Sequence, residues 1–476
     1  MQYRVILSPE RQRTGDAKPM DTHAPSSDAV YRKIAIRLLP FLLACYIINY
    51  LDRVSIGYAK LQFVPDLHLN EAVFGLITSA FFVGYILFEI PSNLLLLRIG
   101  APKTLMRIMT LWGLVIVSMA YAQNEYWFYV QRFLLGAFEA GFFPGVLLYL
   151  SFWFPNHQRG RATSLFLVGI PLSGVLGGAI SGAVMEGMDG LLGLRGWRWL
   201  FLVDGVPAVL LGLAAYFVLT DRPENARFLS PAEKRLVIAD MAADRQARAH
   251  APATNIREVL TSSKVWLMVG VYFTMAFLNT NQIWFPTLLR KSGAGSVTEA
   301  AWILAGIWSV VAIFVLLVSR NSDRVGERRW HLLATGLLAG VAYLTLPLAA
   351  GNLWTTAFLV MLSAGGGYAV FTIFWTIPPI YLEGRGAAMG IALVSALGQF
   401  GGLSGPAVVG WAFQETGSLY LGLSLAAVLL LIGVAVAVFV IPHSRLHRAP
   451  DEGRNGDEGS TSRGGTFIAS NPRQGG

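Results

Sequence analysis

Twelve long apolar segments restrict this chain to very few folds. Each has about 18 to 25 residues, enough for an α-helix to cross the hydrocarbon core of a bilayer. Only 14% of the 476 residues are charged, whereas a soluble domain has about 25%. We therefore expect an all-α membrane protein with twelve transmembrane helices in two six-helix repeats. The segments cover residues 36–58, 73–97, 104–122, 127–151, 163–185, 199–219, 265–286, 300–319, 331–350, 354–377, 387–411 and 419–441.

A polar connection divides these segments into six and six. The N-terminal residues contain no apolar core, so they are not a secretory signal peptide. Met20 is an alternative start to Met1, because the residues before it resemble an upstream extension or a flexible tail. The expected organisation is a disordered cytoplasmic tail (1–33), an N-terminal six-helix bundle (34–220), a cytoplasmic central loop (221–264), a C-terminal six-helix bundle (265–442) and a second disordered cytoplasmic tail (443–476).

The basic residues predict the orientation. If the N-terminus is cytoplasmic, 30 Lys and Arg residues lie on the cytoplasmic side and 5 on the other. The positive-inside rule then places both termini in the cytoplasm. The same distribution explains the net charge of +9, so a nucleic-acid partner is not expected. The absence of targeting signals and the basic loops suit a multi-pass protein of a bacterial inner membrane.

Two short basic loops occur at matching positions in the two halves. The sequences are Arg98-Ile-Gly100 and Asp323-Arg324-Val-Gly326, and their arginines are 226 residues apart. Repeated halves of this kind are typical of transporters that rock around a central site. We interpret these loops as parts of a gate, although short basic loops are common in membrane proteins of many kinds.

Five motifs in the apolar segments are distinctive: Tyr50-Leu-Asp52-Arg53, Phe81-Phe-Val-Gly-Tyr85, Arg132-Phe-Leu-Leu-Gly136-Ala-Phe-Glu139, Phe374-Trp375-Thr-Ile-Pro378 and Gly398-Gln-Phe-Gly401. Together they resemble the anion:cation symporter branch of the major facilitator superfamily. The resemblance extends over the whole membrane portion. It implies import of an organic anion with protons, the substrates of relatives being tartrate, sugar acids, phthalate and hydroxyphenylacetate. A monomer is the family default.

Four charged residues inside apolar segments form the candidate site. Asp52, Arg53, Arg132 and Glu139 lie where a charge costs roughly 2.5–3.5 kcal/mol. An arginine presents a planar fork that matches a carboxylate, and a carboxyl group in a poorly hydrated site can bind and release a proton. We predict that the two arginines bind the anion and that the two acidic residues carry protons. The alternative is that Asp52–Arg132 or Arg53–Glu139 pairs only stabilise helix packing.

Further residues are expected to contact the substrate. Tyr50 and Tyr85 can donate hydroxyl groups, although tyrosines in membrane helices often serve packing instead. The resemblance implies that Thr372 and Trp375 touch the substrate. Ser395 and Gln399 stand where many relatives have Asn, which indicates a substrate with different polar groups.

The sequence favours a transporter over other classes. No GxxxxGK[ST] motif for nucleotides is present, no nucleophile is placed with a base, the histidines are scattered, and Cys45 is the sole cysteine. We therefore expect no enzyme activity, no metal and no cofactor. The expected partners are an organic anion, protons and the lipid bilayer. A tartrate or sugar acid is the preferred substrate; an aromatic carboxylate, an anion exchanger or facilitator without proton coupling, and a sensor derived from a transporter are alternatives.

Overall fold

The computed structural model describes residues 26–249, 256–382 and 387–442, and these residues are largely helical. Each of the twelve apolar segments forms one helix or several short helices in series. Among the described residues, ten spans are long and apolar enough to cross a membrane, and the third and seventh segments form the shorter helices α3 and α11. The expectation of an all-α fold is confirmed. The two expected tails lie outside the described residues, except that α1 begins at Ser27 and so includes residues 27–33.

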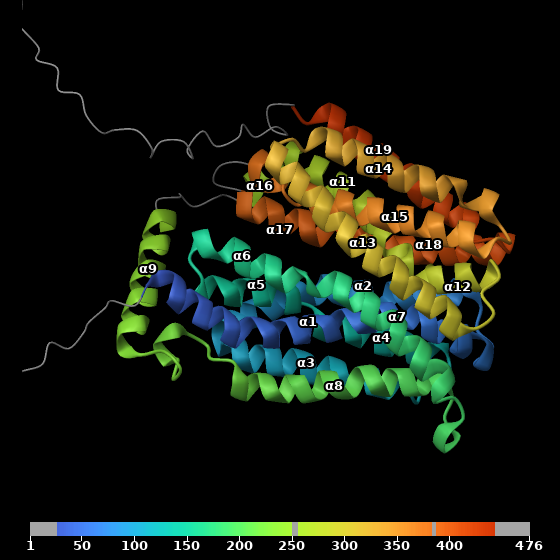
Figure 1. Cartoon of the computed structure of the whole chain (residues 1–476), viewed down its shortest axis with the longest axis horizontal. Helices are drawn as coiled ribbons and strands as arrows, with labels where there is room; N and C mark the ends of the chain where they lie inside the picture. Colours follow the sequence, from blue (N-terminus) through green and yellow to red (C-terminus); the bar gives the residue numbers. More distant parts are fainter. Residues whose placement is uncertain (1–25, 250–255, 383–386, 443–476) are drawn as a thin grey trace, which may run out of the picture.

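The six segments before the central connection form one bundle and the six after it form another (Figure 1). The first contains α1 (Ser27–Asp66), α2 (Glu71–Ile99), α3 (Ala101–Met119), α4 (Glu125–Glu139), α5 (Phe142–Trp153), α6 (Asn156–Leu167), α7 (Gly169–Gly187), η1 (Leu191–Gly193) and α8 (Gly196–Val218). The second contains α11 (Ser263–Asn279), η3 (Thr280–Trp284), α12 (Phe285–Lys291), α13 (Val297–Val325), α14 (Arg329–Thr345), η4 (Leu346–Ala349), α15 (Leu353–Phe374), α16 (Pro378–Tyr381), α17 (Ala387–Gly398), α18 (Phe400–Thr416) and α19 (Tyr420–Val440).

The central connection folds into helices rather than an extended loop. It contains η2 (Pro223–Asn225), α9 (Pro231–Ala249) and α10 (Ile256–Leu260). The α9 helix lies across one end of the first bundle, which we call the α9 end; the opposite end is the distal end (Figure 1). Two side-chain contacts attach α9 to α1: Tyr31 Oη donates to Asp240 Oδ2 at 2.9 Å, and Lys33 Nζ pairs with Glu233 at 2.9 Å. The Lys33 ammonium holds the pKa of Glu233 below its usual range.

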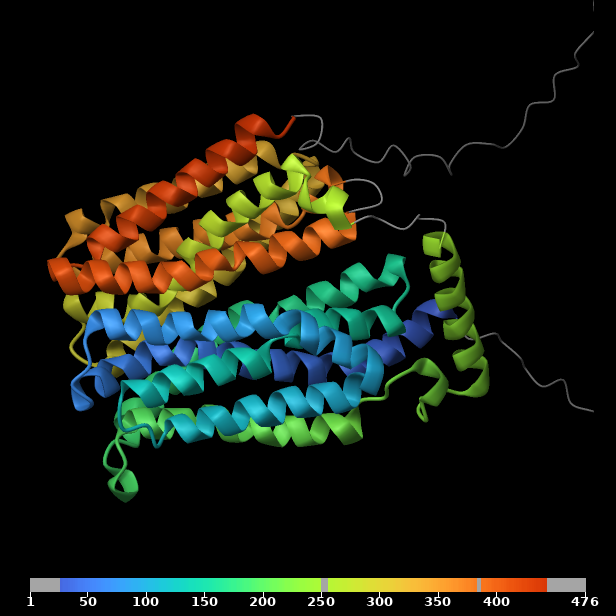
Figure 2. The same cartoon turned by 180° about the vertical axis from the view of Figure 1, so that it is seen from behind.

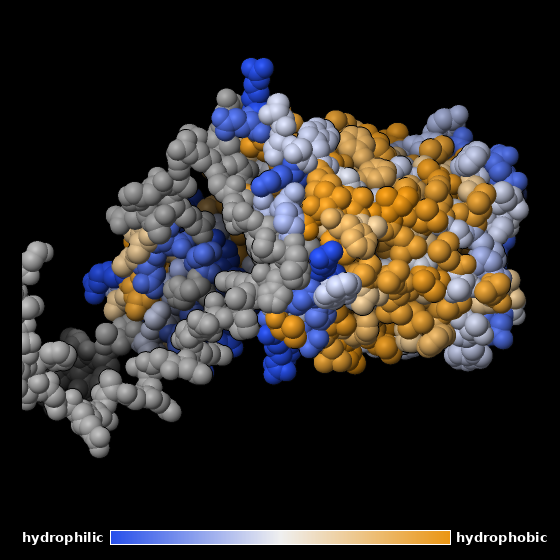
Figure 3. Space-filling model, turned by 90° about the horizontal axis from the view of Figure 1, so that it is seen from above, coloured by the Kyte–Doolittle hydropathy of each residue, from blue (hydrophilic) through white to orange (hydrophobic). Residues whose placement is uncertain are grey.

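The outer surface matches a membrane environment. A broad hydrophobic belt covers the helices on the face in view, and hydrophilic residues gather at both ends of the molecule (Figure 3). Large apolar side chains such as Leu87, Phe217 and Phe439 are exposed on this surface. A soluble protein of this size does not expose a continuous apolar surface of this extent, because water makes it unfavourable.

The internal repeat is visible in the helix boundaries. Helices α2 and α13 each have 29 residues, and both of their ends are offset by 226 positions. Both start with a capping side chain, Asn70 or Ser296, and both end at a glycine with positive φ, Gly100 (85°) or Gly326 (69°). A positive φ favours glycine because it has no Cβ. The two basic loops therefore follow equivalent helices.

The two halves contact each other most closely at the distal end and diverge toward the α9 end (Figures 1 and 2). Helix α7 packs on α13, and α2 packs on α18. Glycines allow this approach: a Cβ at Gly75 would lie 2.5 Å from the Pro406 carbonyl oxygen. Four hydrogen bonds join the halves at the distal end, from Lys60 Nζ to Thr287 (3.1 Å), from Glu71 N to Gln414 (3.3 Å), and from Thr298 to Glu186 (3.1 Å) and to the Gly182 carbonyl (2.7 Å).

Candidate functional site

An ion pair between Arg53 and Glu139 lies in the middle of the first bundle. Arg53 Nε donates to Glu139 Oε1 at 2.8 Å, and a second guanidinium nitrogen contacts the same oxygen. Glu139 is the last residue of α4, because Gly141 adopts a left-handed conformation (φ 86°) and interrupts the helix before α5. The Glu139 side chain is fully buried, and its Oε2 atom has no hydrogen-bond partner among the described residues.

Three aromatic rings surround the Arg53 guanidinium. Its Cζ atom lies 5.6 Å from the centroid of Tyr50, 5.1 Å from Phe81 and 5.4 Å from Tyr85. The close packing of α4 against α2 positions two of these rings, because a Cβ at Gly136 would lie 1.9 Å from the Phe81 carbonyl oxygen. The Arg53 side chain is still 28% exposed. Aromatic faces stabilise a cation there while an edge stays open to a ligand.

Asp52 and Arg132 are buried beside this pair but do not form an ion pair in the described structure. Their relative exposures are 5% and 3%. Neither carboxylate oxygen of Asp52 has a hydrogen-bond partner among the described residues, and the same holds for Arg132 Nε. Asp52 nevertheless interacts electrostatically with Arg132 and Glu139. Of the two packing pairs that the sequence allows, only Arg53–Glu139 is in contact.

A third acidic residue that the sequence analysis missed lies next to Asp52. Asp204 on α8 is 2% exposed and interacts electrostatically with Asp52. Its carboxylate also interacts with the Ser55 hydroxyl of α1. The signal was available, because Asp204 is an acidic residue inside an apolar segment, which is the criterion that selected Asp52 and Glu139.

The second bundle contributes an aromatic and amide cluster around Tyr272 of α11. The rings of Tyr272 and Trp375 are edge to face at 4.9 Å, and Gln399 Nε2 donates to Tyr272 Oη at 3.3 Å. Gly398 permits this approach, since a Cβ there would lie 2.0 Å from the Tyr272 ring. Tyr272 also interacts electrostatically with Arg53, so the cluster belongs to the same central region. Trp375 and Gln399 were predicted from the sequence, whereas the tyrosine that joins them was not.

A hydrogen-bonded pair of the second half lies beside Tyr50 of the first half. Gln282 Nε2 donates to Tyr368 Oη at 2.7 Å, and the Tyr368 hydroxyl lies 3.1 Å from Gln282 Oε1. The Tyr50 hydroxyl also interacts electrostatically with Tyr368. Gln282 and Tyr368 were not selected from the sequence. The signal for Gln282 was an amide inside the apolar segment 265–286.

Thr372 and Ser395 were also predicted to contact the substrate. The Thr372 hydroxyl donates to the Tyr368 carbonyl of its own helix at 2.8 Å. Ser395 lies half-buried on α17, one turn before Gln399.

The predicted gating residues lie at the α9 end, away from this central region. Arg98 and Arg324 are exposed at the ends of α2 and α13. Asp323 pairs with Arg328 at 2.9 Å. In the first half the helix start after Gly100 is capped differently, because the Ala101 N–H donates to Asp221 at 2.8 Å. This contact involves an acidic residue that follows α8, not one from the loop itself.

Comparisons with known proteins agree with this architecture. The Major Facilitator Superfamily profile matches residues 42–395. The "Putative tartrate transporter" of Agrobacterium vitis is 43% identical over 418 residues, covering 86% of this chain and 91% of that protein. The "Putative metabolite transport protein NicT" of Pseudomonas putida is 38% identical over 88% of this chain and 96% of its own length. The inward-open structure of the xylose transporter XylE from E. coli has a TM-score of 0.69 at 14% identity, over 87% of this chain and 96% of that one.

Proposed function

The chain belongs to the Major Facilitator Superfamily, and from that membership we propose that it imports a small organic carboxylate together with protons. Transport proceeds by alternating access, in which the two halves rock around the central site. A tartrate or a sugar acid is the proposed substrate, and the name of the relative that shares 43% identity supports this choice. The protein acts as a monomer.

The observation that carries the proposal is the contact between Arg53 and Glu139. An ionised Glu139 occupies the guanidinium fork that would otherwise bind a carboxylate of the substrate. A protonated Glu139 no longer competes, so Arg53 becomes available to the anion. Proton binding and anion binding therefore favour each other, and this reciprocity is what a symporter requires.

Asp52 and Arg132 give the site a second pair of charges. Asp52 can accept a proton without losing a protein hydrogen bond, because its oxygens have no donor among the described residues. Arg132 provides positive charge behind Phe81, at 5.5 Å from the ring centroid. With two protons for a monoanion, one net positive charge enters the cell. A membrane potential of 100 mV supplies about 2.3 kcal/mol for that charge.

The conformation supports access from the α9 end. The distal end is held together by hydrogen bonds between the halves, yet the Arg53 side chain remains 28% exposed. We propose that the α9 end, both termini and most basic residues face the cytoplasm of a bacterium, with the protein in the inner membrane. The described conformation is then the one that releases substrate into the cell.

A second candidate substrate is an aromatic carboxylate. The central region has aromatic rings on both sides, with Tyr50, Phe81 and Tyr85 from the first half and Tyr272 and Trp375 from the second. Such rings stack on an aromatic acid, and they also cover the apolar face of a sugar acid. Gln399 and Gln282 supply amides, which favour a substrate that carries hydroxyl groups.

Proton movement on substrate addition tests this function. Energy-depleted cells that express the chain are given a panel of tartrate, sugar acids and aromatic carboxylates while the external pH is recorded. We expect the medium to become alkaline with one compound, because protons enter with the anion. Glu139→Gln should abolish this signal yet can preserve exchange of labelled substrate, whereas Glu125→Gln, a half-buried carboxylate at the start of α4, should retain it.

The opposite result is equally informative. Saturable uptake of a labelled carboxylate without any alkalinisation would replace symport by facilitated diffusion or exchange. Full proton-driven accumulation by Glu139→Gln would remove Glu139 from the coupling mechanism.

A further inference from the structure

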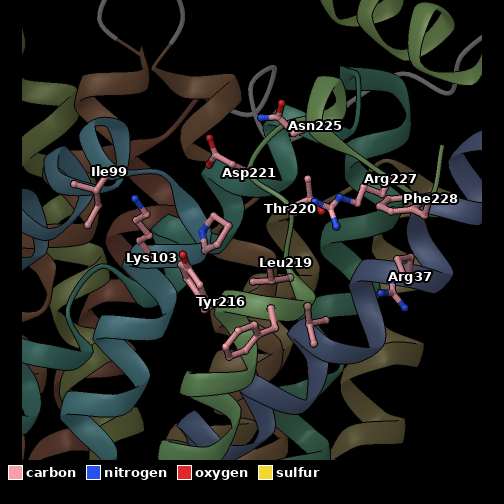
Figure 4. A pocket seen from close by; sticks show the side chains of 13 residues that line it. Arg37, Ile99, Lys103, Tyr216, Leu219, Thr220, Asp221, Asn225, Arg227 and Phe228 are labelled. Atoms are coloured by element: carbon pink, nitrogen blue, oxygen red, sulfur yellow. The ribbon is translucent and has the colours of Figure 1, made fainter. Parts of the chain in front are cut away.

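A cavity of about 620 Å³ opens on the surface at the α9 end, apart from the central site. Helix α3 forms one wall, α1 forms the other, and the end of α8 with the segment after it runs between them (Figure 4). These are the points at which membrane helices end. The cavity is therefore located where the apolar belt meets the polar surface.

Three cations from separate parts of the chain line this cavity. They are Arg37 of α1, Lys103 of α3 and Arg227 of the central connection. All three are exposed, and none has an ion pair or hydrogen bond within the part of the chain that the structure describes. Figure 4 shows Lys103 on one side of the cavity and Arg37 and Arg227 on the other. A ligand between them would be contacted by positive charge from two sides.

The one acidic side chain among the described lining residues does not neutralise these cations. Asp221 Oδ1 accepts the Ala101 N–H at 2.8 Å, and this N–H belongs to the positive N-terminal end of α3. The other carboxylate oxygen lies 3.8 Å from Arg222 Nε. Both oxygens are thus directed to groups outside the set of three cations, and the cavity retains an excess of positive charge.

Apolar side chains extend from the same cavity into the belt. Phe217 is 82% exposed, Tyr216 46% and Ile99 39%. All three line the cavity as well. Tyr216 is a residue type that favours the boundary between hydrocarbon and headgroups, because its ring is apolar and its hydroxyl is polar. The surface therefore offers cations for a headgroup beside apolar contacts for acyl chains.

We propose that this cavity binds the headgroup of an anionic phospholipid. The phosphodiester oxygens accept hydrogen bonds from the Arg37 and Arg227 guanidinium groups, and Lys103 adds a point charge from α3. The acyl chains lie along Phe217 and Ile99. Basic pockets between membrane helices are a recognised arrangement for such headgroups. A bound lipid would connect α1 and α3 of the first half to the central connection.

Lipid binding by the purified full-length protein tests the proposal. Phosphatidylglycerol or cardiolipin is added to delipidated protein in neutral detergent, with phosphatidylethanolamine and inorganic phosphate as comparisons. Bound lipid is measured by native mass spectrometry and the midpoint of thermal unfolding is recorded. We expect the anionic lipids to bind and to raise the midpoint. Replacing one cation should weaken binding roughly fivefold, and the triple variant Arg37→Gln, Lys103→Gln, Arg227→Gln should abolish it.

A matched variant removes the same charge elsewhere. Arg32, Arg161 and Arg235 are exposed at the α9 end but do not line the cavity. Their triple replacement by Gln should leave lipid binding intact. Equal loss in both triple variants would overturn the proposal, as would equal stabilisation of the natural protein by inorganic phosphate, which would indicate a soluble ligand. If the triple variant does not fold, the single variant Lys103→Gln still tests the site. Unchanged lipid affinity in Lys103→Gln would also contradict the proposal.

Discussion

At the level of single residues, the Arg53 guanidinium contacts Glu139 and, in the proposed function, also binds the substrate anion. Arg53 donates to Glu139 in the described conformation, and three aromatic rings hold it in place without using its hydrogen-bonding capacity. Aromatic faces stabilise the positive charge but accept no strong hydrogen bond from it. Protonation of Glu139 therefore frees the nitrogen atoms that face it for an anion, and the planar geometry of arginine suits a carboxylate.

Replacing Arg53 tests this division of roles. Arg53→Lys keeps the charge but loses the fork, and a hydrogen bond to a charged group contributes about 1.5–3 kcal/mol. We expect the dissociation constant of the substrate to rise roughly tenfold or more in Arg53→Lys, and binding to be lost in Arg53→Ala and in Arg132→Ala. Isothermal titration of purified protein measures this, with the exposed Arg320→Lys as control. Normal affinity in both alanine variants would exclude the carboxylate-binding role.

At the level of helices, close contacts between α2 and α4 determine where the site residues lie. A Cβ at Gly136 would approach the Phe81 carbonyl oxygen to 1.9 Å, and a Cβ at Gly84 would approach the Phe133 carbonyl oxygen to 2.1 Å. Helices pack at this distance only where each presents a glycine to the other. Phe81 and Tyr85 come from this part of α2, so the aromatic surroundings of Arg53 depend on it.

Adding one methyl group at this contact should therefore affect both stability and transport. Overpacking a tight contact costs about 1–3 kcal/mol, so Gly136→Ala should lower the midpoint of thermal unfolding by several degrees. Transport should also decrease, because Phe81 moves relative to Arg53. The control is Gly187→Ala, where no atom lies within 4 Å of the added Cβ. An unchanged midpoint in Gly136→Ala would show that the helices separate without cost.

The docking of α9 on α1 should depend on pH. Glu233 has a lowered pKa because Lys33 donates a hydrogen bond to it. Its contribution to docking is therefore fully present above the unfolded pKa of about 4.3 and is lost as the pH falls through the lower folded value.

Hydrogen exchange of the α9 amides measures this dependence after correction for intrinsic exchange rates. Protection of α9 should decrease between pH 7 and pH 3. Glu233→Gln should already be less protected at pH 7 and change less with pH, whereas Glu224→Gln should behave like the natural protein. Identical profiles in Glu233→Gln and the natural protein would show that the pair does not hold α9.

At the level of the whole molecule, closure of the distal end depends on a buried lysine. Lys60 is 2% exposed, and its ammonium pairs with Glu71 at 2.6 Å and donates to Thr287 of the other half at 3.1 Å. It also lies 4.1 Å from the centroid of the Trp284 ring. Glu71 belongs to the first half, while Thr287 and Trp284 belong to the second. One side chain thus joins both halves at the end that would open in the proposed alternating-access cycle.

Lys60→Met should shift the protein toward opening of the distal end. Loss of a charged hydrogen bond removes about 1.5–3 kcal/mol from the closed state, which corresponds to a population change of roughly tenfold or more. Ile283, a buried residue at this interface, is replaced by Cys to report opening through maleimide labelling. Cys45 contributes little background because it is buried.

Labelling of Ile283→Cys should be faster in Lys60→Met than in the natural background. The matched control is Lys291→Met, since Lys291 faces the ring of Phe413 within its own half. Equal labelling in the two lysine variants would mean that Lys60 does not stabilise the closed end.

The sequence alone determined the number and type of the membrane helices, their division into two halves and the charged residues placed inside them. These features depend on local constraints, because each apolar segment must satisfy its own backbone hydrogen bonds in lipid, and each buried charge carries its cost wherever it is placed. The matching loops after α2 and α13 could also be predicted from the sequence, because the feature that ends each helix is local: a glycine with positive φ.

The tertiary structure decided which of these charges meet. It pairs Arg53 with Glu139 and leaves Asp52 without a direct partner among the described residues, and it adds Asp204 and Tyr272 to the central region. It also folds the central connection into α9 against α1. These contacts join residues far apart in the chain, so they depend on how closely helices pack and where a helix is interrupted, as at Gly141. Helical periodicity places a side chain on a face but does not specify which helix that face meets.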